Sequence, residues 1–459
     1  MKILNRPIAV LTLLLVLGVS SLASAQTDSS DSQTITEGMQ AAVPGIIKYL
    51  NDNELKTVGV LKFRVQKPGQ KTSDSVGPMN SLLADRLELG LVLGNPFDGD
   101  QQLKIIEGAS SHVAKLNGAD HLTDEGRTEL FGTQYPIAWG DEQASPDAFL
   151  TGVVAIHEDN LNATVGILCF KKDGDGLERI GEAFTAGLDA ASFSESGQSF
   201  MLRGAFDHGK VNTTFKEVQT KKQQAIKTSV KTIKTGQSAW PLNDPTAPMN
   251  LQVLYDGVVM PVELRDGSAF VKEPRQGQRV ELALIRNGIV DGRMGAVLKV
   301  NGENTLYRST VRDLDAPKWI LSKKHQRTIV RGYQIQGKNE LEKFKVLSDS
   351  ESKSRKMNYG RNVGQIQLTV FREMTGPAPS DFILDEDEED LIAMMRGVHP
   401  KEQPKNLGAL KHQIRLAGKF GPQTRGLIVE GDKDKNKVKV VKFKPDPTPL
   451  MSVTITYYK

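Results

Sequence analysis

Apolar and polar positions in the first half of the chain follow two different periods. From Thr34 to residue 50, apolar residues recur three and four positions apart, which predicts a helix capped by Thr34 or Thr36. A second helix is expected from Met79, with a leucine-rich face toward the core. The acidic residues of this second helix, Asp85 and Glu88, are predicted to face away from that core.

The other apolar patterns of this half have the length and period of strands. Residues 149–156 form an almost unbroken apolar run, and Val165 and Cys169 share one face of the alternating stretch that follows. DGDG at 173–176 predicts a hairpin turn. Strands are expected at 57–65, 103–107, 149–156, 161–170 and 177–186. Because helices precede adjacent strands, we predict a layered α/β or α+β module over 34–206.

After residue 250 the pattern becomes one of short strands between turns rich in Asp, Asn and Gly. This spacing is typical of an antiparallel β-sandwich, which we predict over 250–459. An acidic helical insertion, containing DEDEED at 385–390, is expected to interrupt it near 375–425. Strands are expected at 251–255, 258–264, 269–271, 280–286, 296–300, 305–308, 328–334, 344–347, 366–371, 437–444 and 452–458.

Lysines dominate the segment between the two predicted domains. They outnumber the acidic residues between Lys210 and Lys234, and Trp240-Pro241 with two further prolines ends the segment. We interpret 207–249 as a lysine-rich, solvent-exposed linker with some helical tendency. Contact of the Lys210–Lys234 cluster with an anionic surface or ligand is the alternative.

The N-terminal residues have the layout of a secretory signal peptide. Lys2 and Arg6 precede an apolar stretch of about a dozen residues, too short for a membrane helix, and Ala23-Ser24-Ala25 forms the cleavage site. We therefore expect a signal peptide at 1–25 and a disordered tail at 26–33. Gln26 follows the site where a lipoprotein would have cysteine, so no lipid anchor and no transmembrane helix are expected. The mature chain is predicted to be periplasmic or secreted.

Charge and cysteine content narrow the classes of function. Removing residues 1–25 takes away Lys2 and Arg6 and lowers the formal charge from +4 to +2. Such a chain lacks the positive field that holds nucleic acid, which we exclude as a partner. The single cysteine, Cys169, excludes an internal disulfide or a thiolate metal cluster, and its apolar neighbours predict a buried, unreactive thiol.

Residues that could bind a metal or take part in catalysis are present, but their spacing matches no known metal-binding or catalytic motif. His157-Glu158-Asp159 is the densest cluster of potential ligands and is expected on an exposed loop. The acidic run 385–390 is expected to begin a helix rather than to bind calcium. Residues 432–436 begin like a calcium loop that lacks its glycine and glutamate, and they predict a hairpin tip.

The serine motifs of acyl-transfer enzymes are also incomplete. Ser350-x-x-Lys353 and Lys-Thr-Gly at 234–236 stand in the wrong order for a penicillin-binding enzyme. We predict no catalytic, cofactor-binding or metal-binding residues.

The first module resembles the α/β modules of bacterial envelope proteins, the TolB N-terminal-like, FlgO-like and curli-secretion-subunit (CsgG)-like group. The resemblance is carried by TVGVLKFRV (57–65), MNSLLADRLELGLVLG (79–94), LKIIEG (103–108), FLTGVVAI (149–156) and LNATVGILCFKK (161–172). These segments span roughly residues 40–205. The resemblance implies a scaffold that binds other envelope components, and it supplies no catalytic residue.

Together these observations favour an exported, non-enzymatic binding or scaffold protein of the cell envelope, with other envelope proteins as partners. The alternative is a secreted hydrolase or carbohydrate-binding protein whose site lies on the sandwich loops. Trp319, Tyr307 and Tyr333 are the aromatic residues that would stack on a sugar, although each is also expected in the core.

Overall fold

The computed structural model describes residues 33–97, 99–172, 174, 176–203, 215–265, 268–275, 277–288, 290–346, 357, 359–360, 364–374, 404–420, 433–436 and 438–457. The predicted signal peptide, nearly all of the tail, Ser350–Lys353 and the acidic run 385–390 lie outside these residues. The chain divides into two units, Met1–Ser32 and Gln33–Lys459, and all of the described residues belong to the second.

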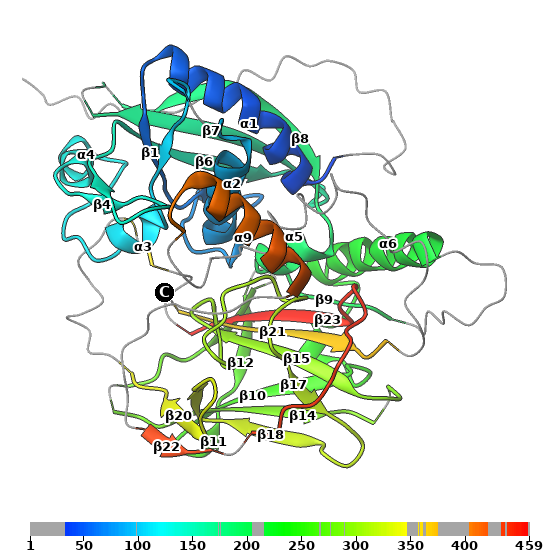
Figure 1. The fold of residues 1–459 in the computed structure, drawn as a ribbon. Helices are drawn as coiled ribbons and strands as arrows, with labels where there is room; N and C mark the ends of the chain where they lie inside the picture. Colours follow the sequence, from blue (N-terminus) through cyan, green and yellow to red (C-terminus); the bar gives the residue numbers. More distant parts are fainter. Residues whose placement is uncertain are drawn as a thin grey trace, which may run out of the picture. The chain divides into compact units, whose positions relative to one another are not determined.

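The first half of this unit contains a mixed six-stranded sheet in the order β3-β1-β6-β7-β8, with β2 also pairing with β6. The pairs made by β1 and β2 are parallel, and β6, β7 and β8 form an antiparallel meander. Helix α1 packs against α2 and β8 (Figure 1). The helices are α1 (Ile35–Asp52), α2 (Met79–Gly94), α3 (Ala109–Val113), α4 (Asp124–Phe131) and α5 (Ala190–Glu195). The strands are β1 (Thr57–Val60), β2 (Arg64–Gln66), β3 (Lys104–Ile105), β4 (Tyr135–Pro136), β5 (Gln143–Ala144), β6 (Ala148–Ile156), β7 (Asn162–Lys171) and β8 (Glu178–Gly187).

Helix α1 begins where its sequence predicts. Thr34 is the N-cap residue, and its hydroxyl accepts from the Glu37 backbone N–H while the Glu37 carboxylate accepts from the Thr34 N–H, a complete capping box. The apolar residues that define its period are all buried, namely Ile35, Met39, Val43, Ile46, Ile47 and Leu50.

Several charged residues of this half lie in the interior, and Glu88 is one that contradicts its predicted position. Glu88 was expected to face away from the core, but it is buried and accepts the Gly108 N–H at 3.0 Å. Burial raises the pKa of Glu88 well above its usual value despite that hydrogen bond. The predicted strand 57–65 is divided into β1 and β2, and within the gap the buried Lys62 donates to the Gly360 carbonyl at 2.6 Å.

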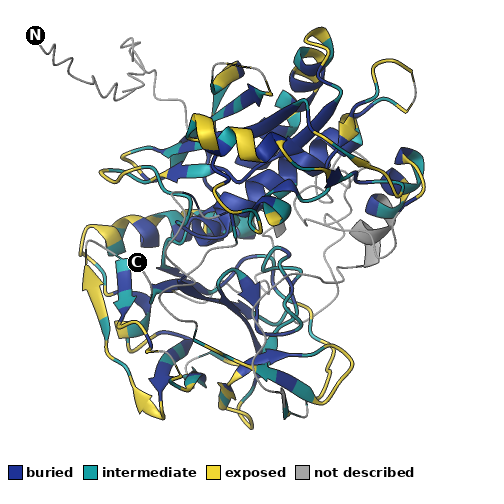
Figure 2. Ribbon diagram, turned by 90° about the vertical axis from the view of Figure 1, so that its left-hand side faces the viewer, coloured by how far each residue is buried: buried dark blue, intermediate teal, exposed yellow. Residues whose placement is uncertain are grey.

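The second half of the unit is built from two main sheets that share one core. A four-stranded antiparallel sheet has the order β11-β10-β14-β18, and an eight-stranded sheet has the path β12-β13-β23-β21-β15-β16. Met249, Leu284, Leu298 and Val453 are examples of side chains from both sheets in the shared core. Figure 2 shows buried residues along the inner strands of this half and exposed residues at its edges. The predicted fold class, a mixed α+β fold with a sheet-rich part, is confirmed.

The strands of these sheets depart from the sequence pattern at several places. Tyr307 and Arg308 have positive φ angles of 63° and 53°, so 305–308 is a turn and not a strand. The predicted strand 437–444 is absent among the described residues, and the predicted hairpin tip 432–436 contains β22 instead. The strands are β9 (Phe200–Met201), β10 (Met249–Tyr255), β11 (Val258–Val259), β12 (Val262–Arg265), β13 (Ser268–Val271), β14 (Val280–Arg286), β15 (Met294–Val300), β16 (Glu303–Asn304), β17 (Trp319–Leu321), β18 (Arg327–Val330), β19 (Gly332–Gln334), β20 (Glu340–Lys343), β21 (Gln365–Arg372), β22 (Lys433–Lys435) and β23 (Met451–Thr456).

Three elements connect the two halves. Strand β9, within the predicted first module, pairs with β23 of the eight-stranded sheet. Helix α6 (Phe215–Lys234) lies within the predicted linker 207–249, and its Ile226 and Val230 are buried in the core of the first module. Helix α9 (Leu407–Phe420) falls within the predicted insertion near 375–425, yet Leu410 and Ile414 pack into that same core. A short 3-10 helix, Pro241–Asn243, follows α6.

None of the helices in the described part of the chain is both long enough and apolar enough to cross a membrane.

Candidate functional site

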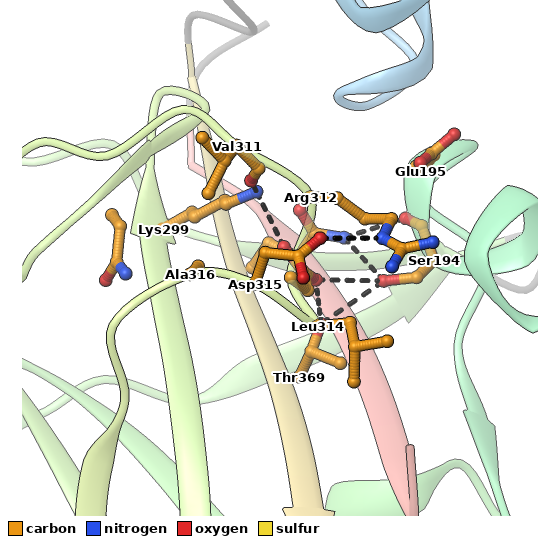
Figure 3. A network of polar contacts seen from close by, with 12 residues as sticks. Ser194, Glu195, Lys299, Val311, Arg312, Leu314, Asp315, Ala316 and Thr369 are labelled. Carbon is orange, nitrogen blue, oxygen red and sulfur yellow. Dashed lines mark hydrogen bonds and ion pairs between the residues drawn. The ribbon is translucent and has the colours of Figure 1, made fainter. Parts of the chain in front are cut away.

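A buried polar network lies where α5 meets the eight-stranded sheet. Lys299 on β15 is only 2 % exposed, and its ammonium lies 2.6 Å from Asp313 Oδ1. Thr369 on β21 donates to the other Asp313 oxygen at 2.5 Å, and Ser194 Oγ on α5 lies 3.4 Å from that same oxygen. Figure 3 shows Lys299, Ser194 and Thr369 converging on the network from different elements.

The network holds α5 on the sheet through further contacts of Ser194. Its hydroxyl lies 2.9 Å from Ser452 Oγ on β23 and 3.2 Å from Thr369 Oγ1. Gln367 Nε2 donates to the Ser194 carbonyl at 2.7 Å. Strands β21 and β23 and the loop that carries Asp313 therefore all contact this one serine of α5.

Burial and neighbouring charges act in opposite directions on Asp313. Burial alone would raise its pKa, but the Lys299 ammonium and the hydrogen bonds from Lys299 and Thr369 hold it below its usual value. At the next residue of α5, burial raises the pKa of Glu195, even though Arg86 Nη2 lies 2.5 Å from its Oε1. Both carboxylates are thus engaged with buried cations.

Ser194 with Asp313 beside it resembles a catalytic serine with a neighbouring carboxylate, but the surroundings of the pair are unfavourable for activating the serine. A serine becomes a nucleophile when a neighbouring base accepts its proton. Asp313 is a poor base near neutral pH because its pKa is lowered and its carboxylate is neutralised by Lys299. The Lys299 ammonium itself contacts Asp313 and the Val311 carbonyl. A cavity of about 170 Å³ adjoins Ser194, too small for a typical organic substrate. The contacts of the network are those of a structural junction.

A larger hollow of about 720 Å³ lies in the second half of the unit, between β17 and residues 438–445. These residues, called the strap below, belong to the segment drawn in red ahead of β23 in Figure 1. Aromatic and aliphatic side chains predominate in the lining, among them Trp319, Tyr307, Ile320 and Phe443. A volume of this size is in the range of small-molecule and peptide sites.

The strap is held at both ends. Upstream of it, Asn436 Nδ2 donates to Gln334 Oε1 at 2.9 Å. Downstream, Arg293 donates to the Lys442 carbonyl at 2.9 Å, and the Phe443 ring packs so closely on Gly295 that a Cβ there would lie 2.7 Å from it. Between these anchors Val440 is 83 % exposed, which is unusual for a valine.

Two charged groups of this cavity, Lys318 and Arg293, are already engaged by the protein. The Lys318 ammonium donates to the carbonyls of Asp313, Leu314 and Ala316 at 2.9, 2.7 and 2.8 Å. Burial lowers its pKa to about 8, although Asp313 opposes this effect. Arg293 forms a two-pronged ion pair with Glu373. The lining is therefore suited to contact and stacking more than to proton transfer.

The cluster singled out in the sequence, His157-Glu158-Asp159, lies at the turn between β6 and β7. Asp159 accepts the N–H groups of Leu161 and Asn162 at 2.8 and 3.1 Å. Burial would raise its pKa, but these bonds lower it. His157 Nε2 lies 2.8 Å from Thr164 Oγ1. Across the residues that the structure describes, no three His, Cys, Asp or Glu side chains gather as metal ligands.

The remaining sequence candidates are dispersed. The Lys-Thr-Gly at 234–236 begins at Lys234, the last residue of α6. Cys169 is buried on β7, as predicted, and burial raises its thiol pKa to about 12. Of the three aromatics, Trp319 and Tyr307 line the larger cavity, whereas Tyr333 is 3 % exposed and belongs to the core.

Sequence reasoning missed both the network and the cavity. Lys299 was one available signal, because a single lysine interrupts the apolar strand AVLKV at 296–300. Its partner Asp313 stands in a loop with no distinguishing pattern. For the cavity, Trp319 and Tyr307 were the available signal, but its position depends on where the irregular strap crosses a sheet.

Comparison with known proteins identifies no family for this chain. No family model matches the sequence, and no curated protein matches it. One solved structure, the LpoB C-terminal domain from Salmonella enterica, aligns with 13 % identity and a TM-score of 0.21, covering 34 % of this chain and 98 % of that one. A TM-score this low supports no conclusion about fold or function.

Proposed function

We propose that this protein is an exported, non-enzymatic binding or scaffold protein of the bacterial cell envelope, and that the cavity beneath the strap is its binding site. One observation carries the proposal. The hollow of about 720 Å³ is lined mainly by apolar and aromatic side chains, while Lys318 and Arg293 are already engaged with protein groups. Such a lining favours holding a ligand over transforming one.

The envelope location rests on the sequence. The pattern of Lys2, Arg6 and Ala23-Ser24-Ala25 supports export to the periplasm or the medium. The resemblance of the segments within 57–172 to envelope modules supports partners among other envelope proteins.

Site-specific photo-cross-linking in bacteria tests the binding site. A photoreactive residue at Val440 should give protein adducts of defined mass, because this side chain is exposed beside the cavity. Thr328→Trp, which puts a larger side chain into the cavity lining, should reduce those adducts. The same probe at the exposed Lys48 of α1 is the control. Equal adduct yields at Val440 and Lys48, unchanged by Thr328→Trp, would refute the assignment.

An activity screen tests the non-enzymatic character. The mature protein is incubated with peptidoglycan, glycan, peptide and ester substrates, with and without divalent metal. We expect no turnover. Turnover that disappears in Ser194→Ala, while circular dichroism stays unchanged, would make the buried network the active site and overturn the proposal.

A second candidate function, carbohydrate binding, is favoured by one specific observation. Trp319 and Tyr307 line the same cavity, and aromatic rings are the usual stacking surfaces for sugars. Trp319 Nε1 donates to Thr305 Oγ1 at 2.9 Å, which holds the ring in place. Affinity electrophoresis in polysaccharide gels tests this candidate. Trp319→Ala should abolish retardation, and Trp139→Ala in the first module should not.

A further inference from the structure

Strand β12 exposes one edge of the eight-stranded sheet. It pairs with β13 on one side, and in the described part of the chain no strand pairs with its other side. Three of its residues, Glu263, Leu264 and Arg265, are exposed, and Leu264 is 44 % exposed. An edge strand with outward N–H and C=O groups and an exposed apolar side chain is a template for another strand.

We propose that β12 pairs antiparallel with β12 of a second copy of this chain, across a twofold axis that passes between the two Leu264 residues. The pairing joins the two eight-stranded sheets into one continuous sheet. The inference does not depend on the proposed function, because β12 contributes no residue to the cavity beneath the strap.

The register follows from the charges on the strand. With Leu264 opposite Leu264 of the second copy, Glu263 faces Arg265 of the second copy, and Arg265 faces its Glu263. Opposite charges directly across an antiparallel pair are stabilising. The register centred on Glu263 would instead place two carboxylates opposite one another. Registers centred between residues would place Leu264 against a charged side chain.

The side chains already lie on the faces that this register requires. Arg265 Nη2 lies 2.5 Å from Glu263 Oε2, so both charges share one face of the strand, and the guanidinium lies 5.8 Å from the centre of the Phe270 ring. Leu264 therefore lies on the opposite face, together with Val262, because side chains alternate along a strand. Val262 packs against the shared core of the two sheets. Pairing thus brings the Leu264 side chains of the two copies together on one face. On the other face, Glu263 and Arg265 form ion pairs with the second copy in place of the pair within one strand.

A charge-exchange experiment tests this interface by sedimentation velocity over a range of concentrations. The wild-type mature chain should show a reversible monomer–dimer equilibrium. Glu263→Arg and Arg265→Glu should each weaken self-association at least about tenfold, because each places like charges opposite one another twice. An equimolar mixture of these two single variants should dimerise again, since every facing pair then has opposite charges. Lys48→Glu on α1 is the control for a general effect of charge.

Disulfide trapping tests the register separately. Facing Cβ atoms in an antiparallel pair lie about 4.5–5.5 Å apart. Leu264→Cys should therefore form a disulfide-linked dimer under mild oxidation, and Glu263→Cys should not; native Cys169 is buried and does not compete. A wild-type chain that stays monomeric at all concentrations would overturn the proposal. Dimerisation unaffected by the single charge variants, failure of their mixture to reassociate, or equal trapping at 263 and 264 would overturn it too.

Discussion

Lys222 and Asp446 are separated by 224 positions in the sequence, and their side chains form a 2.5 Å ion pair in which both are buried. The pair joins helix α6 to the loop before β23. A segment whose lysines were expected to be solvated therefore contains one of the buried ion pairs of the fold. Removing one member of such a pair leaves an uncompensated charge in a poorly solvated place.

Lys222→Met should consequently destabilise the protein by about 3–5 kcal/mol, measured by urea unfolding at pH 7. Lys221→Met is the matched control, because Lys221 is the preceding residue of the same helix and is exposed. A Lys222→Met/Asp446→Leu double variant should recover much of the loss, since it removes both charges. Equal stabilities for the two single variants would show that the buried pair is not formed.

Asp313→Asn should lower stability at neutral pH because it leaves the Lys299 ammonium buried without its counter-charge; we expect a loss of about 3–5 kcal/mol. The folded-state pKa of Asp313 lies below its unfolded value, so its contribution is complete above the unfolded pKa of about 3.9 and is lost as the pH falls through the folded pKa. The difference between wild type and variant should therefore shrink in acid.

Unfolding curves of both proteins between pH 7 and pH 2.5 measure this change. Asp291→Asn is the control, because Asp291 forms an exposed pair with Lys323 and should leave stability unchanged. A constant difference between wild type and Asp313→Asn across this range would contradict the assigned pKa shift.

Gly152→Ala should destabilise the first module by about 1–3 kcal/mol, because an added Cβ would lie 2.2 Å from the Phe63 ring and 2.8 Å from the Gly166 carbonyl oxygen. Gly166→Ala on the neighbouring strand β7 is the matched control, since nothing lies within 4 Å of a Cβ there. Thermal unfolding followed by circular dichroism separates the two. A tolerated Gly152→Ala would mean that the close packing of β6 on Phe63 is wrong.

Cys169 should not react with a thiol reagent in the native protein. Burial excludes the reagent, and it raises the thiol pKa to about 12, so the reactive thiolate is scarce at pH 8. In urea the thiol should react completely within minutes, which a chromogenic disulfide assay records. Rapid labelling without denaturant would show that Cys169 on β7 is accessible to solvent, which would contradict its burial.

Much of the local structure could be predicted because it depends on neighbouring residues. The 3.6-residue period and Thr34 define α1, and the alternation around Cys169 defines β7. The sequence around a charged residue does not show whether that residue is buried or exposed. Glu88 and Lys222 each lie on a helix at a position where a charged side chain is expected to face solvent, yet both are buried. The Gly108 N–H donates a hydrogen bond to Glu88, and the Asp446 carboxylate pairs with Lys222.

By itself the sequence determined the helices and strands with clear periodicity and the change from a mixed to a sheet-rich half, since hydrophobic periods and turn residues act over a few positions. Tertiary structure alone decided that α9 packs on the first module, that Lys299 meets Asp313 beside Ser194, and that the strap leaves a cavity over β17. These features arise from contacts between segments far apart in the chain. The free energy of each such contact depends on how deeply both partners are buried and on their geometry. A pattern of neighbouring residues in the sequence determines neither of these.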